Sequence, residues 1–99
     1  MLNINKTLEN ATMTFALEGR LDTVTAPELE QELHDLPENV TELIFDLAKL
    51  EYISSAGLRV LLSAQKLMNV RGKMIVRNVN EVVAEIFEVT CFTDILTIE

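Results

Sequence analysis

Apolar positions near the start of the chain recur at every second residue, which is the period of a β-strand with one buried face. Two stretches show this alternation, residues 2–5 and residues 12–18. Glu9-Asn10 lies between them and predicts a tight turn, and Gly19 ends the second stretch. The first part of the chain therefore predicts a β-hairpin.

The apolar spacing then changes to three and four residues, which indicates a helix. Thr25 and Glu28 have the spacing of a capping box, and Pro27 lies in the first turn, where a missing N–H is tolerated. Pro37 ends the pattern. The buried stripe of this predicted helix consists of Leu29, Leu33 and Leu36, and its acidic residues are expected to face solvent.

A strand and a second helix follow, and they meet at a pair of serines. Residues 43–47 form an apolar run broken only by Asp46, as expected of a strand covered on both faces. A short loop leads from this strand to Ser54-Ser55, where the helical period begins, and Gly72 lies where a glycine would end the helix. The apolar stripe of this helix consists of Gly57, Val60, Leu61, Ala64, Leu67 and Met68.

The last third of the chain repeats the alternation of strand and helix. Residues 74–76 predict a strand, Asn80 predicts the N-cap of a third helix, and Ile95, Leu96 and Ile98 predict a short final strand. Such alternation implies parallel crossovers, while the opening hairpin adds an antiparallel pair. We predict one α/β domain over residues 1–99, a mixed and mostly parallel β-sheet with helices packed on it. The strand order stays open.

Charge narrows the classes of function. The chain carries 16 acidic and 8 basic residues, a net charge of −8, which disfavours binding to nucleic acid or to an anionic membrane surface. A protein partner is favoured instead. The chain has no secretory signal and no apolar run of the roughly 20 residues that span a bilayer, so we expect a cytoplasmic location.

Few residues offer catalytic chemistry. His34 is the only histidine, stands among acidic residues on a predicted helix, and has no second ligand at metal-binding spacing. Cys91 is the only cysteine, and beside Phe92 we expect it to be buried as a packing residue. The chain contains neither a nucleophile elbow nor a glycine-rich phosphate loop. We therefore predict no catalytic residue, no metal, no cofactor and no enzymatic activity.

The serine pair has two physical interpretations. A serine at a helix start caps the helix by accepting a hydrogen bond from a free backbone N–H. The same position exposes a hydroxyl at the positive end of the helix dipole, where a phosphate carrying about −1.5 to −2 charges is tolerated. The residue pattern by itself leaves both interpretations open.

Residues 45–61 read FDLAKLEYISSAGLRVL and resemble the signature of the STAS domain, most closely that of bacterial anti-sigma factor antagonists. Gly19-Arg20-Leu21-Asp22 resembles a second motif of this family, Gly-x-Leu-Asp. The family signature contains Asp-Ser-(Ser/Ala)-Gly-Leu, and its first serine is phosphorylated. When the signature is aligned on Gly57-Leu58, that serine corresponds to Ser55, and Ser54 replaces the usual aspartate.

The resemblance implies a partner-switching cycle. The unphosphorylated chain would bind an anti-sigma factor that is also a serine kinase with an ATP-binding, histidine-kinase-like fold, and binding would free the sigma factor. The kinase would phosphorylate Ser55, with Ser54 as the second choice, and thereby release the chain. A serine phosphatase would restore binding. Asp22 is expected to lie near Ser55 and to help place the nucleotide or basic residues of the kinase.

Two leucines of the serine helix lie away from its apolar stripe. Leu58 and Leu62 are one turn apart on the side of Arg59 and Lys66. We expect Leu58, Leu62 and Arg59 to form part of a docking surface. The full set of expected partner-binding residues is Asp22, Ser54, Ser55, Gly57, Leu58, Arg59 and Leu62.

Two other functions remain alternatives. The chain could be a STAS interaction module of another assembly, such as a lipid-transport subunit or a signalling scaffold, with Ser55 acting only as a helix cap. A serine hydrolase would need a base within reach of Ser55, and the only imidazole, His34, lies in a different predicted helix.

Overall fold

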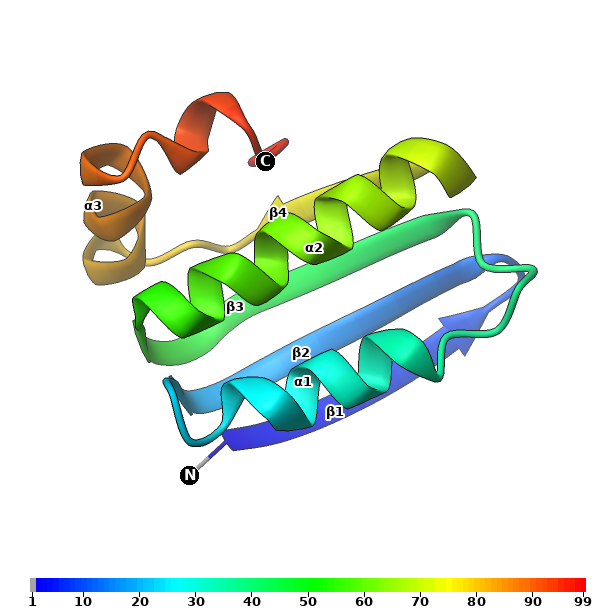
Figure 1. Cartoon of the computed structure of the whole chain (residues 1–99), viewed down its shortest axis with the longest axis horizontal. Coiled ribbons are helices and arrows are strands. Elements are labelled where there is room, and N and C mark those ends of the chain that lie inside the picture. The colour runs from blue at the N-terminus through cyan, green and yellow to red at the C-terminus, as the bar shows by residue number, and fades with distance from the viewer. Residues whose placement is uncertain (1) are drawn as a thin grey trace.

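Four strands form one mixed β-sheet in the computed structural model, which describes residues 2–99 (Figure 1). They are β1 (Leu2–Glu9), β2 (Thr12–Leu21), β3 (Glu42–Ile53) and β4 (Lys73–Arg77). The order across the sheet is the order along the chain, with β1 antiparallel to β2 and the other two pairs parallel. The predicted α/β class and mixed sheet are confirmed.

The third strand is longer than predicted. Residues 48–53 were expected to form a loop, but they continue β3 alongside β2 as far as Ile53. Two irregularities in the pairing, between Ala16 and Glu18 and between Gly19 and Arg20, place extra residues on the β3 side. The buried residues of this part are therefore Leu47, Leu50 and Ile53, at a spacing of three that does not indicate a strand.

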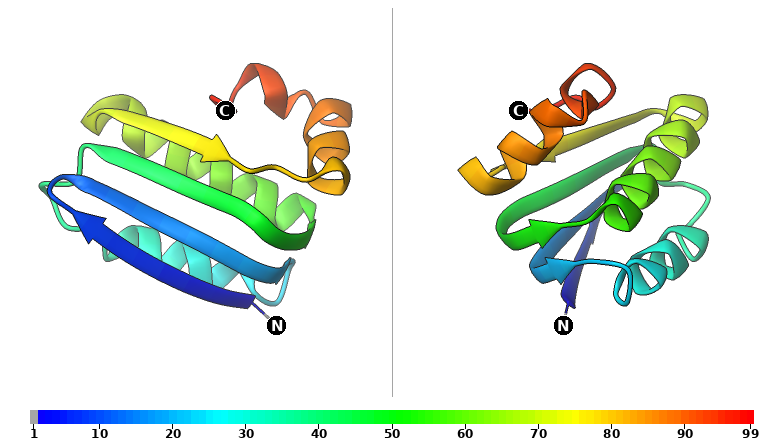
Figure 2. Two further views of the ribbon diagram at one scale, coloured as in Figure 1. Left: turned by 180° about the vertical axis from the view of Figure 1, so that it is seen from behind. Right: turned by 60° about the vertical axis from the view of Figure 1, so that its left-hand side comes forward.

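Two helices cover one face of the sheet. α1 (Ala26–His34) and α2 (Ser55–Arg71) lie side by side on this face, while α3 (Glu81–Val89) packs against β3 beyond the end of β4 (Figures 1 and 2). No helix of residues 2–99 covers the opposite face (Figure 2, left). The core between sheet and helices includes Phe15, Phe45, Leu17, Leu29, Leu43, Leu61, Met68 and Phe87.

The helix starts differ from one another. Asn80 caps α3 as predicted, since its Oδ1 accepts a hydrogen bond from the Val83 N–H at 2.9 Å. Thr25 is the N-cap residue of α1, but its side chain makes no capping hydrogen bond. The predicted capping box with Glu28 is therefore wrong, because the Thr25 hydroxyl is held by the preceding turn instead.

The C-terminal segment does not form the predicted strand. A short 3-10 helix, η1 (Phe92–Asp94), follows α3, and only Ile98 forms an isolated bridge, with Val76 of β4. Cys91 is exposed rather than buried, and it lies at a backbone turn between α3 and η1 with φ of 64°. None of the helices in residues 2–99 has both the length and the apolar character needed to cross a membrane.

Candidate functional site

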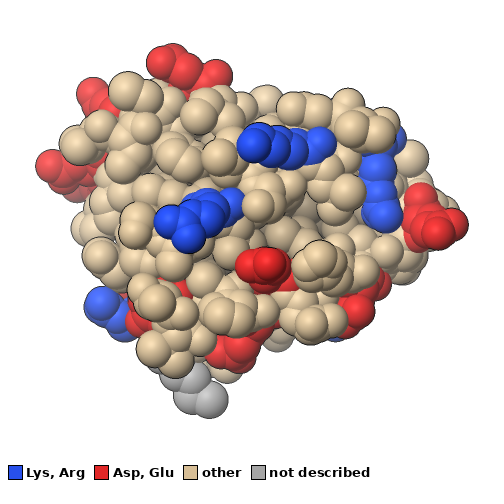
Figure 3. Space-filling model, in the orientation of Figure 1, with Lys and Arg blue, Asp and Glu red and all other residues tan. Residues whose placement is uncertain are grey.

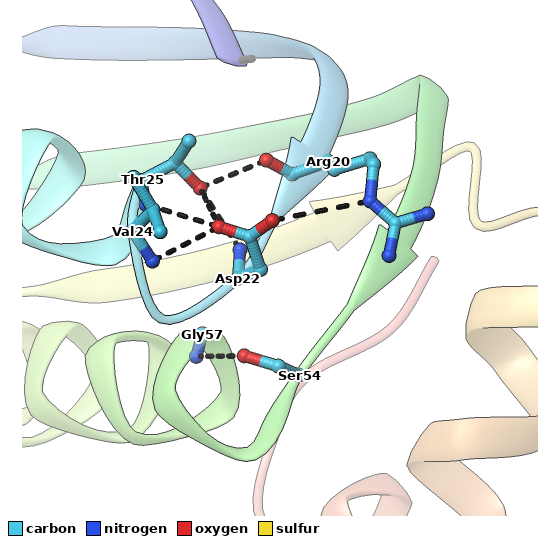
Figure 4. A network of polar contacts seen from close by, with 6 residues as sticks. All are labelled: Arg20, Asp22, Val24, Thr25, Ser54 and Gly57. Atoms are coloured by element: carbon cyan, nitrogen blue, oxygen red, sulfur yellow. Dashed lines mark hydrogen bonds and ion pairs between the residues drawn. The ribbon is translucent and has the colours of Figure 1, made fainter.

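The candidate site is the amino end of α2, where the chain leaves β3. Ser54 is the N-cap residue, and its Oγ accepts a hydrogen bond from the Gly57 N–H at 3.4 Å (Figure 4). Ser55 is the first residue of the helix and is exposed. No residue in the described range 2–99 forms a hydrogen bond with its hydroxyl. The prediction that a serine caps the helix is thus confirmed for Ser54, and the Ser55 hydroxyl is left accessible.

Backbone contacts hold this tip against the end of β2. The Ser54 N–H donates to the Leu21 carbonyl at 2.9 Å. Gly57 is buried, and a Cβ at this position would lie 2.7 Å from Leu21 Cγ and 2.8 Å from Ile53 Cγ1. A glycine is therefore required because the helix approaches both strand ends too closely for a side chain. The role of Gly57 in the structure is close packing, and its backbone N–H donates to the capping side chain of Ser54.

Asp22 organises the turn that faces the tip. One oxygen of its carboxylate, Oδ1, accepts hydrogen bonds from the Val24 N–H at 3.0 Å and the Thr25 N–H at 3.1 Å. The Thr25 hydroxyl donates to the Arg20 carbonyl at 2.8 Å and accepts the Asp22 N–H at 2.9 Å. The pKa of Asp22 is lowered, chiefly because the carboxylate accepts the Thr25 N–H. The carboxylate is therefore ionised at neutral pH and already occupied by its own turn.

Arg20 connects this turn to β3, and its contacts were not predicted. Its Nε lies 3.9 Å from Asp22 Oδ2, and its guanidinium carbon lies 4.5 Å from the centre of the Tyr52 ring. Arg20 belongs to the motif Gly19–Asp22. Its contact with Tyr52 was not predictable from the sequence, because it depends on the irregular register between β2 and β3. Asp22, Arg20 and Tyr52 thus line the sheet end next to the serines.

The charges of the three α-helices are segregated. α2 contains Arg59, Lys66 and Arg71 and no acidic residue, whereas α1 and α3 each contain three glutamates and neither lysine nor arginine. Figure 3 shows basic side chains over α2, with acidic side chains over the flanking elements. α1 and α3 also have a glutamate in the first turn, and α2 has none. The positive end of the α2 dipole is therefore not compensated by an acidic side chain of the helix.

A groove runs from the serine tip between α1 and α2. Two neighbouring depressions share Glu30 and Ser63 and follow the contact of the two helices. The depression nearer the tip is lined by Thr23, Ala26, Pro27, Glu30, Ala56, Arg59, Val60 and Ser63. Small side chains form its floor, and Arg59 and Glu30 supply opposite charges on its two sides. The farther depression includes His34, Leu67 and Arg71.

Leu58 is not part of an exposed strip. It is 5% exposed and belongs to the hydrophobic core, so the expectation that Leu58 docks a partner is wrong. The buried surface of α2 is wider than its apolar stripe, because a second row of buried residues (Leu58, Leu61, Gln65 and Met68) continues around the helix. Leu62 is half-buried, and Arg59 is exposed one turn after Ser55.

The structure does not bring a catalytic base to the serines. His34 is exposed at the end of α1, 3.9 Å from Glu30, and the residues of α2 that line the same depression are Ser63, Leu67 and Arg71. Ser63, the nearest of them to the tip, lies 8 residues after Ser55, which corresponds to about 12 Å along a helix. Among residues 2–99, no group of three or more His, Cys, Asp or Glu side chains could hold a metal ion.

Comparisons with known proteins identify relatives of the whole chain. The family model of the STAS domain matches residues 3–99. The Bordetella bronchiseptica protein BtrV, which its name assigns to the anti-sigma factor antagonists, is 37% identical over 84 residues, covering 83% of this chain and 72% of BtrV. The anti-sigma-B factor antagonist of Staphylococcus aureus is 29% identical over 97 residues, covering 96% of this chain and 90% of the relative.

Solved structures share the fold. The crystal structure of an anti-sigma factor antagonist from Mycobacterium paratuberculosis has a TM-score of 0.84 at 20% identity and covers 99% of this chain and 85% of its own. The structure of the Bacillus cell fate determinant SpoIIAA in its phosphorylated form has a TM-score of 0.76 at 17% identity, covering 98% and 91%. At these identities the likeness shows the fold alone.

Proposed function

Because the chain belongs to the STAS domain family, and its sequence relatives are named as anti-sigma factor antagonists, we propose that it acts as one of them. In this proposal, the unphosphorylated chain binds an anti-sigma factor that is also an ATP-dependent serine kinase, and binding frees the sigma factor. Phosphorylation of Ser55 ends the binding, and a serine phosphatase restores it. The cycle takes place in the cytoplasm.

The observation that carries the proposal is the exposed, unengaged hydroxyl of Ser55 on the first turn of α2. A kinase must reach the hydroxyl from outside, and Ser54 is less suited because its Oγ already accepts the Gly57 N–H. The absence of an acidic residue from the first turn of α2 leaves the helix dipole available to a phosphate. The domain can therefore accept the modification without unfolding.

The partner-binding surface in this proposal consists of the tip and the groove beside it. Ser54, Ser55 and Arg59 contribute from α2, and Asp22 lies in the facing turn. Gly57 contributes only by allowing the close approach of the tip to Leu21. Arg59 gives this surface a positive charge, so the partner is expected to present an acidic or polar face to it.

In this proposal, one phosphate on Ser55 switches binding through its charge. A dianion at an interface must be desolvated or must face acidic groups of the partner, which costs several kcal/mol unless an arginine cluster receives it. A cost of about 1.4 kcal/mol already weakens binding tenfold. Arg59 lies one turn along the helix and can screen the phosphate in the free chain, which further favours the released state.

Phosphorylation by the cognate kinase tests the site directly. The chain has three serines, Ser54, Ser55 and Ser63, and Ser63 is exposed on the same helix and serves as the control. We expect Ser55→Ala to abolish phosphate incorporation, while Ser54→Ala and Ser63→Ala retain it, as measured by mass spectrometry. If Ser54→Ala loses phosphate incorporation while Ser55→Ala retains it, the modified residue is Ser54 and the assignment to Ser55 is wrong.

Partner binding tests the switch. Ser55→Asp is expected to weaken binding to the anti-sigma factor kinase at least tenfold, because it places a negative charge on the tip. Calorimetry measures the affinity. Thr93→Asp adds the same charge at an exposed position of η1 and should bind like the unmodified chain. Equal binding by the two variants would exclude the tip from the interface.

A further inference from the structure

The outer edge of β1 is an open strand edge. β1 is the first strand in the sheet order, and among residues 2–99 no segment pairs with its outer side. All eight residues from Leu2 to Glu9 pair with β2 in regular register. The strand contains no proline and no bulge, two of the devices that protect an edge, and its charged residues are Lys6 and Glu9. Its outward N–H and C=O groups can therefore receive another strand.

The opposite edge of the sheet is covered in part by the chain itself. The Val76 N–H donates to the Thr97 carbonyl at 2.8 Å, and the Glu99 N–H donates to the Val76 carbonyl at 2.8 Å. Arg77 adds an ion pair to Glu99 at 3.4 Å. The C-terminal segment thus pairs with β4 at Val76, whereas no segment of residues 2–99 pairs with the outer side of β1.

A groove beside the β1 edge specifies what its occupant must offer. It lies between β1 and α1 and is lined by Leu2, Ile4, Pro27, Glu28, Gln31 and Glu32. Leu2, Ile4 and Pro27 favour contact with apolar side chains. Glu28 favours a cation, whereas Glu32 is already paired with Lys6 of the same chain. A strand that pairs with β1 should therefore present an apolar and a basic side chain on alternate residues of this face.

β1 carries this combination itself. Lys6 and Leu8 lie on the same face as Leu2 and Ile4, because the four positions alternate with residues of the other face. Leu8 is 48% exposed, and Lys6 beside it on this face is exposed as well. Lys6 lies 2.9 Å from Glu32 of its own chain, so it already stands at the acidic side of the groove.

We propose that a second copy of this chain pairs through β1, antiparallel and symmetric about Asn5, to form a continuous eight-stranded sheet. In this register Lys6 of one copy lies opposite Ile4 of the other, near the acidic side of the groove. Leu8 lies opposite Leu2 and covers the apolar end. Thr7 lies opposite Asn3 on the other face of the sheet. No two like charges are opposed.

Two neighbouring registers are less favourable, one because of side-chain placement and the other because of charge repulsion. A one-residue shift places each copy's helices on opposite sides of the sheet and brings the polar residues Asn3, Asn5 and Thr7 to the groove. Symmetry about Lys6 keeps the helices together but opposes the two Lys6 side chains directly, which is destabilising. Symmetry about Asn5 avoids both of these faults.

Disulfide formation tests this register. In a Cys91→Ser background, which removes the exposed native thiol, Asn5→Cys should form a disulfide-linked dimer. Opposed residues of antiparallel strands have Cα atoms about 4.5–5.5 Å apart, within the range of a disulfide. Asn3→Cys alone should not cross-link, because its counterpart is displaced by four residues, about 13 Å. Mixing Asn3→Cys with Thr7→Cys should restore the cross-link.

Sedimentation of the full chain tests the dimer without new thiols. We expect a monomer–dimer equilibrium and at least tenfold weaker association for Lys6→Glu, which places an acidic residue against the acidic groove. Circular dichroism checks that this variant is folded. A chain that stays monomeric at about 1 mM, or thiol variants Asn5→Cys and Asn3→Cys that cross-link equally fast, would overturn the proposal.

Discussion

The starts of α1 and α2 lie side by side at the same end of the sheet, yet they use their hydroxyl groups in opposite ways (Figure 4). At α1, the Thr25 hydroxyl is buried and engaged by Arg20 and Asp22, and the Asp22 carboxylate accepts two backbone N–H groups. At α2, Ser54 makes a single 3.4 Å hydrogen bond, and the Ser55 hydroxyl is exposed. One start is closed by its own side chains, and the other is open.

Under the proposed function, the difference separates the residues that stabilise the turn from the serine that is modified. The closed start fixes the turn that supports the tip, because Leu21 immediately before it accepts the Ser54 N–H. The open start can then be modified without loss of the contacts that hold it. The two helix starts also differ in charge. The first turn of α1 contains Glu28, whereas the first turn of α2 contains no acidic residue.

The largest effect on stability is expected from a side chain at Gly57, which would force the start of α2 away from Leu21. Gly57→Val places a branched side chain 2.7 Å from Leu21 Cγ, which should lower the free energy of unfolding by about 3 kcal/mol. Ser63→Val introduces the same side chain at an exposed position of α2 and should cost less than about 0.5 kcal/mol. Urea unfolding measures both, and equal costs would show that the close approach is not required.

A smaller, pH-dependent effect on stability is expected from removing the charge of Asp22, which holds the turn before α1. The pKa of Asp22 is lowered in the folded chain, mainly by the hydrogen bond from the Thr25 N–H. A carboxylate with a lowered pKa stabilises the fold at pH values above its unfolded pKa, and this stabilisation is lost as the pH falls through the folded pKa. Asp22→Asn should therefore be less stable than the unmodified chain at pH 7.

The difference between the two chains should stay constant down to the ordinary pKa of 3.8 and narrow below it. Thermal unfolding between pH 7 and pH 3 provides the measurement. In the Asp22→Asn variant the amide oxygen of the new side chain can still accept the backbone N–H groups, so the substitution isolates the charge. A difference that grows on acidification would contradict the sign of the pKa shift.

The sequence predicted correctly those structural elements that depend on residues close together in the chain. The hairpin, the three helices, β4 and the Asn80 cap all depend on residues within a few positions of one another, and the structure confirms them. The family resemblance is also confirmed, because it rests on contiguous motifs. The serine tip was found for the same reason, since capping and helix periodicity are readable from neighbouring residues.

The errors arose where distant segments decide the environment. Leu58 was placed on the surface from the periodicity of α2 alone, but the helix is covered over a wider arc, and the second buried row includes the polar residue Gln65. β3 continues past Leu47 because β2 follows it through two irregularities that change the apolar spacing. The bond from Thr25 to Arg20 replaced a capping box that satisfied every local rule. The first two outcomes depend on tertiary contacts that no window of residues contains, whereas the third depends on the conformation of the turn from Arg20 to Thr25.

The smallest effect distinguishes the two serines of the open start. Ser54→Ala removes the side chain that accepts the Gly57 N–H and should cost about 0.5–1 kcal/mol, near the lower end for an N-cap because the bond is 3.4 Å long. Ser55→Ala removes an exposed hydroxyl without a partner among residues 2–99 and should change stability by less than about 0.5 kcal/mol. Urea unfolding of the unphosphorylated chains measures both. If Ser55→Ala were the costlier change, its hydroxyl would be a structural cap, and the two helix starts would not differ as Figure 4 indicates.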